Sequence, residues 1–226
     1  MSFPVVGVIG GGQLARMMAP AAIALGVRLR VLAREATDSA AQVVPDVEIG
    51  DERDLDALRR FAKGCDVLTF DHEHVPTEHL RLLQAEGVVV RPGPDALVHA
   101  QDKAVMRARL TELGVPCPRW AVVASGEDIE VFGDEVGWPI VLKTPRGGYD
   151  GKGVRVVAAA DDAASWMESL GPGESLLAEE RVPFHRELAV LVARSPHGQA
   201  AVYPVVETVQ VDGICREVLA PAAISE

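Results

Sequence analysis

The sequence has 226 residues, of which 48% are hydrophobic and 24% are charged. This length allows one large domain or two small ones, and the apolar fraction excludes a wholly disordered chain. The 33 acidic residues outnumber the 22 basic ones, and the net charge of −11 argues against nucleic acid as a partner, because duplex binding relies on a basic face.

Three further features bear on location. No apolar run reaches the roughly 18 residues needed to cross a bilayer, so we expect no membrane association. The N-terminus lacks the basic segment of a secretory signal. Cys65, Cys117 and Cys215 are few and far apart, which favours free thiols in a reducing compartment. We therefore expect a cytoplasmic protein.

The first hundred residues alternate short β-rich runs with helical patterns. The pattern predicts strands at residues 3–9, 28–32, 66–70 and 88–90, and helices at residues 13–25, 54–61 and 77–85. Strands separated by helices of this length are typical of βαβ units and a parallel sheet. We predict a Rossmann-like α/β domain over residues 1–100.

From about residue 102 the pattern changes to that of an α+β domain, predicted over residues 101–226. Helices are predicted at residues 102–113, 127–135 and 162–170, and strands at residues 121–123, 140–143, 154–157 and 175–178. Residues 187–192, 201–211 and 214–219 are predicted to form consecutive antiparallel strands. Because the sequence stops directly after a strand with no closing helix, we expect a truncated chain.

A glycine loop follows the first predicted strand. Gly10, Gly12 and Ala15 fit the pattern G-x-G-x-x-A, in which a helix N-terminus receives a phosphate. A dinucleotide site of this kind places an acid after the second strand, where this chain has Arg34 followed by Glu35. Arg34 would suit a 2′-phosphate, so an NADP-dependent oxidoreductase is one alternative, and a tight turn without a ligand is another.

Acids and histidines follow the strand at residues 66–70. Strand alternation predicts Asp71 and Glu73 on one face, with His72 and His74 on the other. The H-x-H spacing suggests a metal site, but no third ligand with matching spacing is evident. A carboxylate that accepts hydrogen bonds from a ligand amine or hydroxyl is favoured over that site, with a solvated strand end as the structural alternative.

A lysine and a second glycine loop occur together in the second half. Lys143 closes the apolar run of residues 139–143, and an ammonium there needs an anion because an unpaired buried charge is costly. Residues 147–153 hold four glycines and Lys152, so their N–H groups could wrap a triphosphate. The loop does not match the Walker A pattern, and a flexible hairpin tip is the alternative.

Acidic residues follow at the end of a predicted strand. The segment Glu179–Val182 could offer backbone groups to an adenine edge, and Glu187 could bind ribose hydroxyls. Taken alone, these acids would be surface residues.

The motifs GGGQLARM, DHEHVP, QDK, VLKTPRGGYDGKG, EERV and YPVVETVQVDGICRE occur in this order along the whole chain. This order resembles the ATP-grasp superfamily and, within it, the 5-(carboxyamino)imidazole ribonucleotide synthase family. The resemblance implies ATP-dependent carboxylation of 5-aminoimidazole ribonucleotide with bicarbonate in purine biosynthesis, with Mg²⁺ as a cofactor and a homodimeric enzyme. Other ATP-grasp ligases of purine synthesis, and a non-catalytic nucleotide-binding module, are the alternatives.

The resemblance also implies roles for individual residues. The residues expected to bind ATP are Lys103, Lys143, Gly148, Gly151, Gly153, Val154, Glu179, Glu180, Arg181, Val182, Glu187 and Gln210, the last where relatives commonly carry histidine. Tyr149, Asp150 and Lys152 would line the reacting centre, and Gln13, Leu14 and Glu73 would bind the ribonucleotide. Residues 117–180 would form a small ATP-grasp subdomain and residues 181–226 part of a large one. No magnesium ligand is expected in this chain; these ligands are expected beyond Glu226.

Overall fold

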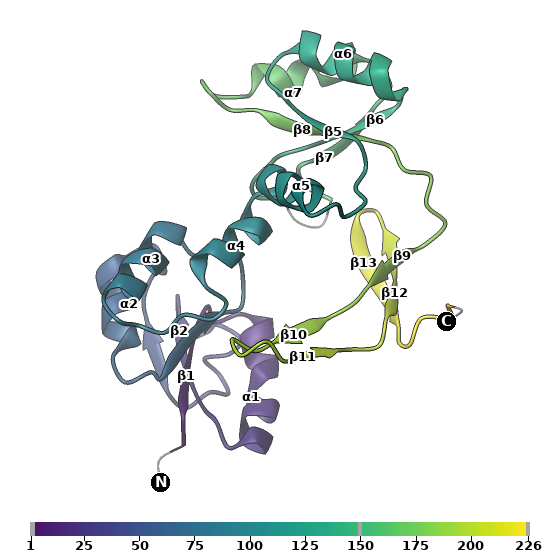
Figure 1. Cartoon of the computed structure of the whole chain (residues 1–226). Coiled ribbons are helices and arrows are strands. Elements are labelled where there is room, and N and C mark those ends of the chain that lie inside the picture. Colours follow the sequence, from purple (N-terminus) through teal and green to yellow (C-terminus); the bar gives the residue numbers. More distant parts are fainter. Residues whose placement is uncertain (1–2, 149–150, 225–226) are drawn as a thin grey trace. The chain divides into compact units, whose positions relative to one another are not determined.

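The structure is a computed structural model that describes residues 3–148 and 151–224 (Figure 1). The chain forms two compact units that divide between Met106 and Arg107. Each unit has a sheet and a hydrophobic core of its own. Within the described ranges, no helix is long and apolar enough to span a membrane.

The first unit is built on a parallel four-stranded sheet with the order β3-β2-β1-β4. Its strands are β1 (Val5–Ile9), β2 (Arg28–Ala33), β3 (Val47–Ile49) and β4 (Val67–Phe70), and its helices are α1 (Gln13–Leu25), α2 (Leu55–Ala62), α3 (Thr77–Ala85) and α4 (Pro94–Gln101). Because β1 pairs with both β2 and β4, the segments that follow these three strands leave the sheet at one edge.

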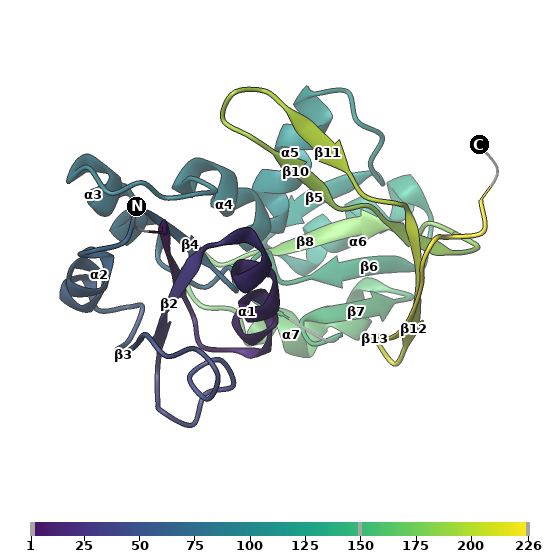
Figure 2. The same ribbon diagram turned by 90° about the horizontal axis from the view of Figure 1, so that it is seen from below.

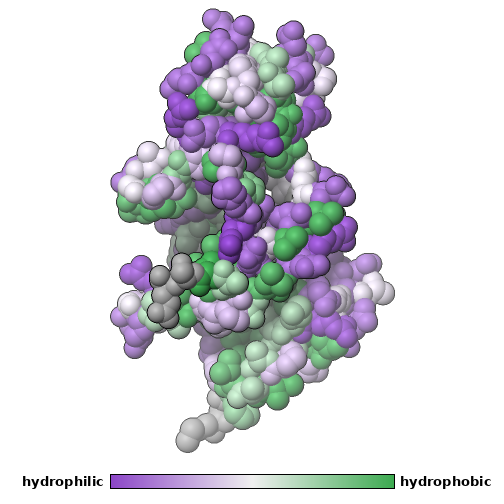
Figure 3. Space-filling model, turned by 90° about the vertical axis from the view of Figure 1, so that its right-hand side faces the viewer, coloured by the Kyte–Doolittle hydropathy of each residue, from purple (hydrophilic) through white to green (hydrophobic). Residues whose placement is uncertain are grey.

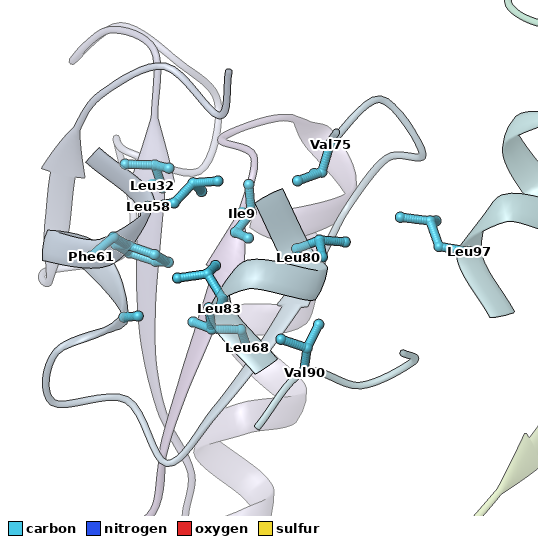
Figure 4. Packing of buried hydrophobic residues seen from close by; sticks show 11 residues of the cluster. Ile9, Leu32, Leu58, Phe61, Leu68, Val75, Leu80, Leu83, Val90 and Leu97 are labelled. Carbon is cyan, nitrogen blue, oxygen red and sulfur yellow. The ribbon is translucent and has the colours of Figure 1, made fainter. Parts of the chain in front are cut away.

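Alternation along β1 divides the core of this unit between the two faces of the sheet. Ile9 packs with Leu58 and Phe61 of α2 on one face, where Figure 4 also shows the buried leucines of α3. Val8 belongs to a second cluster on the other face, with Ala15 of α1. Successive strand residues point to opposite faces, so one apolar run anchors helices on both.

The second unit contains an antiparallel sheet with the order β5-β8-β6-β7. Its strands are β5 (Trp120–Val123), β6 (Ile140–Lys143), β7 (Val154–Val157) and β8 (Leu176–Glu180), which lie side by side in Figure 2. The helices are α5 (Lys103–Glu112), which begins in the first unit, α6 (Gly126–Val136), η1 (Ala160–Ala163) and α7 (Ala164–Glu168). Leu176 and Ala178 of β8 pack with Ile129 of α6, so Glu179 belongs to the other face of the sheet.

Helix α6 begins with a capping box and turns a polar side to solvent. The Ser125 hydroxyl accepts the N–H of Asp128 over 3.1 Å, while the Asp128 carboxylate accepts the N–H of Ser125 over 2.9 Å. Glu127, Glu130 and Glu135 are exposed along the helix, and the surface at the top of Figure 3 is mainly hydrophilic.

The remaining strands form two small antiparallel sheets. They are β9 (Glu187–Ala189), β10 (Val192–Arg194), β11 (Ala200–Val202), β12 (Val206–Val211) and β13 (Ile214–Leu219). β12 pairs with both β9 and β13, and β10 pairs with β11.

Several predicted elements differ in the structure. Residues 88–90 form no strand, only an isolated bridge between Val90 and Leu68. β3 was not predicted because three residues give no usable periodicity, and no helix was predicted at the residues of α4. The predicted strands 187–192 and 201–211 are each split in two, and the predicted helix 162–170 begins as the 3-10 turn η1.

Candidate functional site

The glycine loop after β1 holds an internal anion at the start of α1. The backbone N–H of Gly12, the N-cap of α1, donates to Asp71 Oδ2 over 2.9 Å. The Asp71 side chain is only 4% exposed, and its Oδ1 atom has no hydrogen-bond partner among the described residues. Gly10, with φ of 115°, packs so tightly against Asp71 that a Cβ atom would collide with this carboxylate. A helix N-terminus is a natural anion site, and here a carboxylate of the chain itself fills it.

Arg34, the candidate for a 2′-phosphate, is already paired. Its guanidinium forms an ion pair with Glu52, with Nε donating to Oε2 over 3.2 Å, and its backbone N–H donates to Asp38 over 2.8 Å. Burial disfavours the charged form of Glu52, but the hydrogen bonds and charge of Arg34, together with a backbone hydrogen bond, outweigh it and hold the pKa of this carboxyl below its usual range. Together with the carboxylate of Asp71, this pairing disfavours a dinucleotide site.

The three residues expected to bind a ribonucleotide follow β1 and β4 at the same sheet edge. Gln13 Oε1 accepts the hydroxyl of Ser39 over 2.8 Å, and Leu14 is exposed. The Glu73 backbone carbonyl accepts Gln101 Nε2 over 2.8 Å, while its carboxylate remains partly exposed. The fold therefore brings the segments of Gln13, Leu14 and Glu73 to one edge, where polar neighbours hold Gln13 and the backbone of Glu73.

The alternation predicted for residues 71–74 does not occur. β4 ends at Phe70, and residues 71–74 form bends and a turn instead of continuing the strand. His72 and His74 still lie together, as predicted, with ring centroids 5.4 Å apart, and each is beside the carboxylate of the residue before it. Among the described residues, no three His, Cys, Asp or Glu side chains are grouped so as to hold a metal ion.

In the second unit, the carboxylate of Glu179 joins two cations. Lys143 ends β6, and its ammonium pairs with Glu179 Oε2. Arg107 of α5 donates from Nε to Glu179 Oε1 over 2.7 Å. Glu179 is 4% exposed, Arg107 17% and Lys143 23%. Burial works against ionisation of Glu179, yet the hydrogen bonds from Lys143 and Arg107 prevail and lower its pKa.

The lysine at the end of β6 was predicted, and its partners were not. An apolar run that ends in lysine signals a placed ammonium, whereas the sequence of α5 gives no sign that Arg107 reaches a carboxylate 72 residues away. The carboxylate of Glu179 is occupied by these ion pairs, which leaves the backbone of Glu179–Val182 as the part able to meet a base.

The glycine loop of residues 147–153 follows Lys143 directly. Gly147, Gly148, Gly151 and Gly153 all have φ between 67° and 79°, a region that favours glycine. The Thr144 N–H donates to the Gly153 carbonyl over 2.9 Å, which closes the base of the loop next to Val154. Lys152 has an interaction partner, and the predicted residues Tyr149 and Asp150 lie outside the described residues.

The other residues expected to bind a nucleotide occupy separate places. Glu180 pairs with Arg119, whose Nε donates to Oε2 over 2.9 Å, and Arg181 and Val182 are exposed. Glu187 of β9 lies in register with Thr208 of β12, the strand that also carries Gln210 at a β-bulge. Lys103 is the first residue of α5 and has a partner within the chain.

Both parts of the chain match the models of known domain families. Residues 108–226 match the model of the ATP-grasp domain, and residues 3–101 match that of the ribonucleotide synthetase preATP-grasp domain. Over 220 residues the chain is 58% identical to N5-carboxyaminoimidazole ribonucleotide synthase of Mycobacterium tuberculosis, covering 97% of this chain and 51% of that protein. The chain spans about half the length of the curated relatives it matches.

Solved structures of enzymes with similar names resemble this chain. An N5-carboxyaminoimidazole ribonucleotide synthetase in complex with ADP superposes with a TM-score of 0.90 at 33% identity, covering 99% of this chain and 59% of that one. The enzyme from Aspergillus clavatus, in complex with ADP and 5-aminoimidazole ribonucleotide, gives a TM-score of 0.88 at 31% identity, covering 100% of this chain and 59% of that one.

Proposed function

This chain belongs to the ATP-grasp family, and on that premise we propose that its protein uses ATP and bicarbonate to carboxylate 5-aminoimidazole ribonucleotide. The products are 5-(carboxyamino)imidazole ribonucleotide, ADP and phosphate, a step of purine biosynthesis. The predicted resemblance to the ATP-grasp superfamily and the predicted fold class are confirmed. The activity proposed here is that named for the relatives in the comparisons.

The observation that carries the proposal is the ion-pair cluster at the end of β6. Arg107 and Lys143 bring two positive charges to the single carboxylate of Glu179, which leaves a net positive charge at the base of a glycine loop. A phosphate chain supplies the missing negative charge. We propose that Lys143 contacts the phosphates and that Gly148, Gly151, Gly153 and Val154 close over them, with backbone N–H groups as donors.

The remaining nucleotide contacts in this proposal come from several segments of the sequence. The backbone of Glu179, Glu180, Arg181 and Val182 would meet the adenine edge, Glu187 the ribose hydroxyls, and Lys103 and Gln210 other parts of the nucleotide. β8 supports this arrangement because it ends at Glu180, so the exposed residues that follow are free of the sheet ladder.

The ribonucleotide would bind at the sheet edge of the first unit. Gln13 and Leu14 begin α1, and the partly exposed carboxylate of Glu73 suits the exocyclic amine of an aminoimidazole as a hydrogen-bond acceptor. Because Asp71 already neutralises the N-terminus of α1, this loop is better suited to the base than to a phosphate.

The chemistry proposed for the reacting centre needs no covalent enzyme intermediate. A bicarbonate oxygen attacks the γ-phosphorus of ATP, ADP leaves, and carboxyphosphate forms. The substrate amine then captures the carboxyl carbon, as carbon dioxide or as the mixed anhydride, and phosphate departs. Tyr149, Asp150 and Lys152 are proposed to line this centre, where cations positioned in a closed site stabilise charge on the phosphoryl oxygens.

The resemblance also implies Mg²⁺ and a homodimer, and the few, widely spaced cysteines favour a cytoplasmic location. We include the homodimer and the location in the proposal. The described residues hold no group of three acids, cysteines or histidines that fits a metal ion.

ADP release from ATP tests the proposal. The purified protein, supplied with Mg²⁺ and bicarbonate, is assayed with and without 5-aminoimidazole ribonucleotide, and with glycinamide ribonucleotide as a matched substrate. We expect release that depends on the aminoimidazole compound. Release that responds only to glycinamide ribonucleotide would favour another ligase of the same fold, and tight binding of NADPH without ATP binding would favour the oxidoreductase.

A further inference from the structure

The two oxygens of the Glu179 carboxylate have different partners. Oε1 accepts from Arg107 Nε over 2.7 Å, and Oε2 pairs with the Lys143 ammonium. The groups that act on Glu179 come from α5 and β6, and its neighbour in register on β5, Trp120, is uncharged. Within the described residues, the ion pairs of Glu179 are those with Arg107 and Lys143.

This arrangement limits what Lys143 can do. If Lys143 were the only partner of Glu179, moving its ammonium to a phosphate would leave a buried carboxylate without a counter-ion, which is strongly unfavourable. With Arg107 in place, Glu179 stays paired when Lys143 moves. A second cation is thus required for Lys143 to serve a nucleotide.

Lys143 is the partner able to move. Its ammonium is a compact charge on a flexible four-carbon chain. On the sheet, Lys143 lies in register with Val154 at the base of the glycine loop. Arg107 is the less exposed of the two cations and is held on a helix. The difference in stiffness and position assigns the static role to Arg107 and the mobile role to Lys143.

We propose that Arg107 is a positioning residue for ATP, which keeps Glu179 paired and ionised while Lys143 transfers its ammonium from Glu179 to a phosphate oxygen. This inference rests on the proposed use of ATP. Arg107 itself need not touch the nucleotide. Removing it should therefore weaken ATP binding through Glu179.

The test compares ATP binding to the wild-type protein and to Arg107→Met by isothermal titration calorimetry. Loss of one cation from a buried pair predicts at least about tenfold weaker binding for the variant. When ATP binds to the Arg107→Met variant, the Lys143 ammonium leaves Glu179, and no cation remains paired with this carboxylate. Its pKa then rises, so proton uptake accompanies binding and the affinity falls as pH rises through that raised pKa.

Proton uptake is measured by repeating the titration in buffers with different ionisation enthalpies. We expect more protons to be taken up per ATP bound by Arg107→Met than by the wild type. The wild-type value is the baseline, because it includes the protons taken up by ATP itself. Arg107→Lys should restore most of the affinity. The double variant Arg107→Met, Glu179→Gln should bind ATP more tightly than Arg107→Met, because it has no carboxylate to compensate.

Controls separate this role from a loss of folding. Arg109 lies on the same helix in an exposed pair with Glu112, so Arg109→Met should bind ATP like the wild type. Wild-type protein that does not bind ATP would overturn the proposed function and, with it, this inference. Wild-type binding together with equal affinity and equal proton uptake in Arg107→Met would overturn only the role of Arg107. The role of Arg107 would also be overturned if the double variant is folded, as shown by its melting temperature, but binds ATP no more tightly than Arg107→Met.

Discussion

Asp71 Oδ2 accepts the backbone N–H of Gly12 over 2.9 Å, so a side chain that follows β4 fixes the first turn of the helix that follows β1. The contact joins two segments 59 residues apart and places a negative charge where a phosphate would otherwise bind. This explains how a chain with G-x-G-x-x-A can carry that pattern without a dinucleotide site.

Substitution of Asp71 tests this relationship. Asp71→Ala removes the acceptor for Gly12, and we expect a loss of about 1 kcal/mol in the free energy of unfolding together with weaker use of the ribonucleotide. Asp71→Asn keeps an oxygen for the N–H and should retain more stability. Chemical denaturation measures both variants. Equal stability of Asp71→Ala and the wild type would contradict the capping role.

Glu73 is expected to discriminate between the two substrates. Glu73→Gln replaces a charged acceptor by a neutral one and should raise the KM for 5-aminoimidazole ribonucleotide about tenfold, with the KM for ATP nearly unchanged. Glu78→Gln, at an exposed residue of α3, is the matched control. An unchanged KM for the ribonucleotide would count against the site at this sheet edge.

Lys143→Met should reduce ATP turnover by at least about a hundredfold, because the phosphates lose a placed cation. The fold should tolerate the change, since Glu179 keeps Arg107 as its partner. Lys63→Met, at the exposed end of α2, controls for the loss of a lysine. Near-normal ADP release by Lys143→Met would remove this residue from the phosphate site.

Two neighbouring glycines allow a matched test of the loop. Gly147 and Gly148 both have positive φ, at 67° and 79°. A Cβ at Gly148 would lie 2.5 Å from the Lys152 carbonyl oxygen, whereas a Cβ at Gly147 meets nothing within 4 Å. Gly148→Ala should therefore lower ATP affinity more than Gly147→Ala, as measured by calorimetry. The reverse order would show that steric fit at Gly148 does not control the loop.

The Arg34–Glu52 pair predicts a pH dependence of stability. The pKa of Glu52 lies below its unfolded value of about 4.3, so the pair stabilises the folded state above that pH, and this contribution is lost as pH falls through the folded pKa. Glu52→Gln should flatten the acid limb of the curve of melting temperature against pH. A variant curve parallel to that of the wild type would rule out this contribution.

What the sequence could reveal depended on how local each signal was. The run that ends at Lys143 and the helix Gln13–Leu25 are local patterns, and both occur as predicted. The pairing of Arg107 with Glu179 and that of Arg34 with Glu52 depend on tertiary contacts between distant segments, which periodicity does not encode. The turn at residues 71–74 was misread because alternation was assumed to continue beyond the end of β4.

In the proposed reaction, bicarbonate attacks ATP and the resulting carboxyl group reaches the aminoimidazole. The most direct test supplies ¹⁸O-labelled bicarbonate with ATP, Mg²⁺ and 5-aminoimidazole ribonucleotide, and follows the label into phosphate by ³¹P NMR. Because the attacking oxygen stays on phosphorus when carboxyphosphate breaks down, we expect one labelled oxygen in each phosphate released. Unlabelled phosphate, formed at the same rate without the ribonucleotide, would identify water as the attacking group and exclude carboxyphosphate as an intermediate.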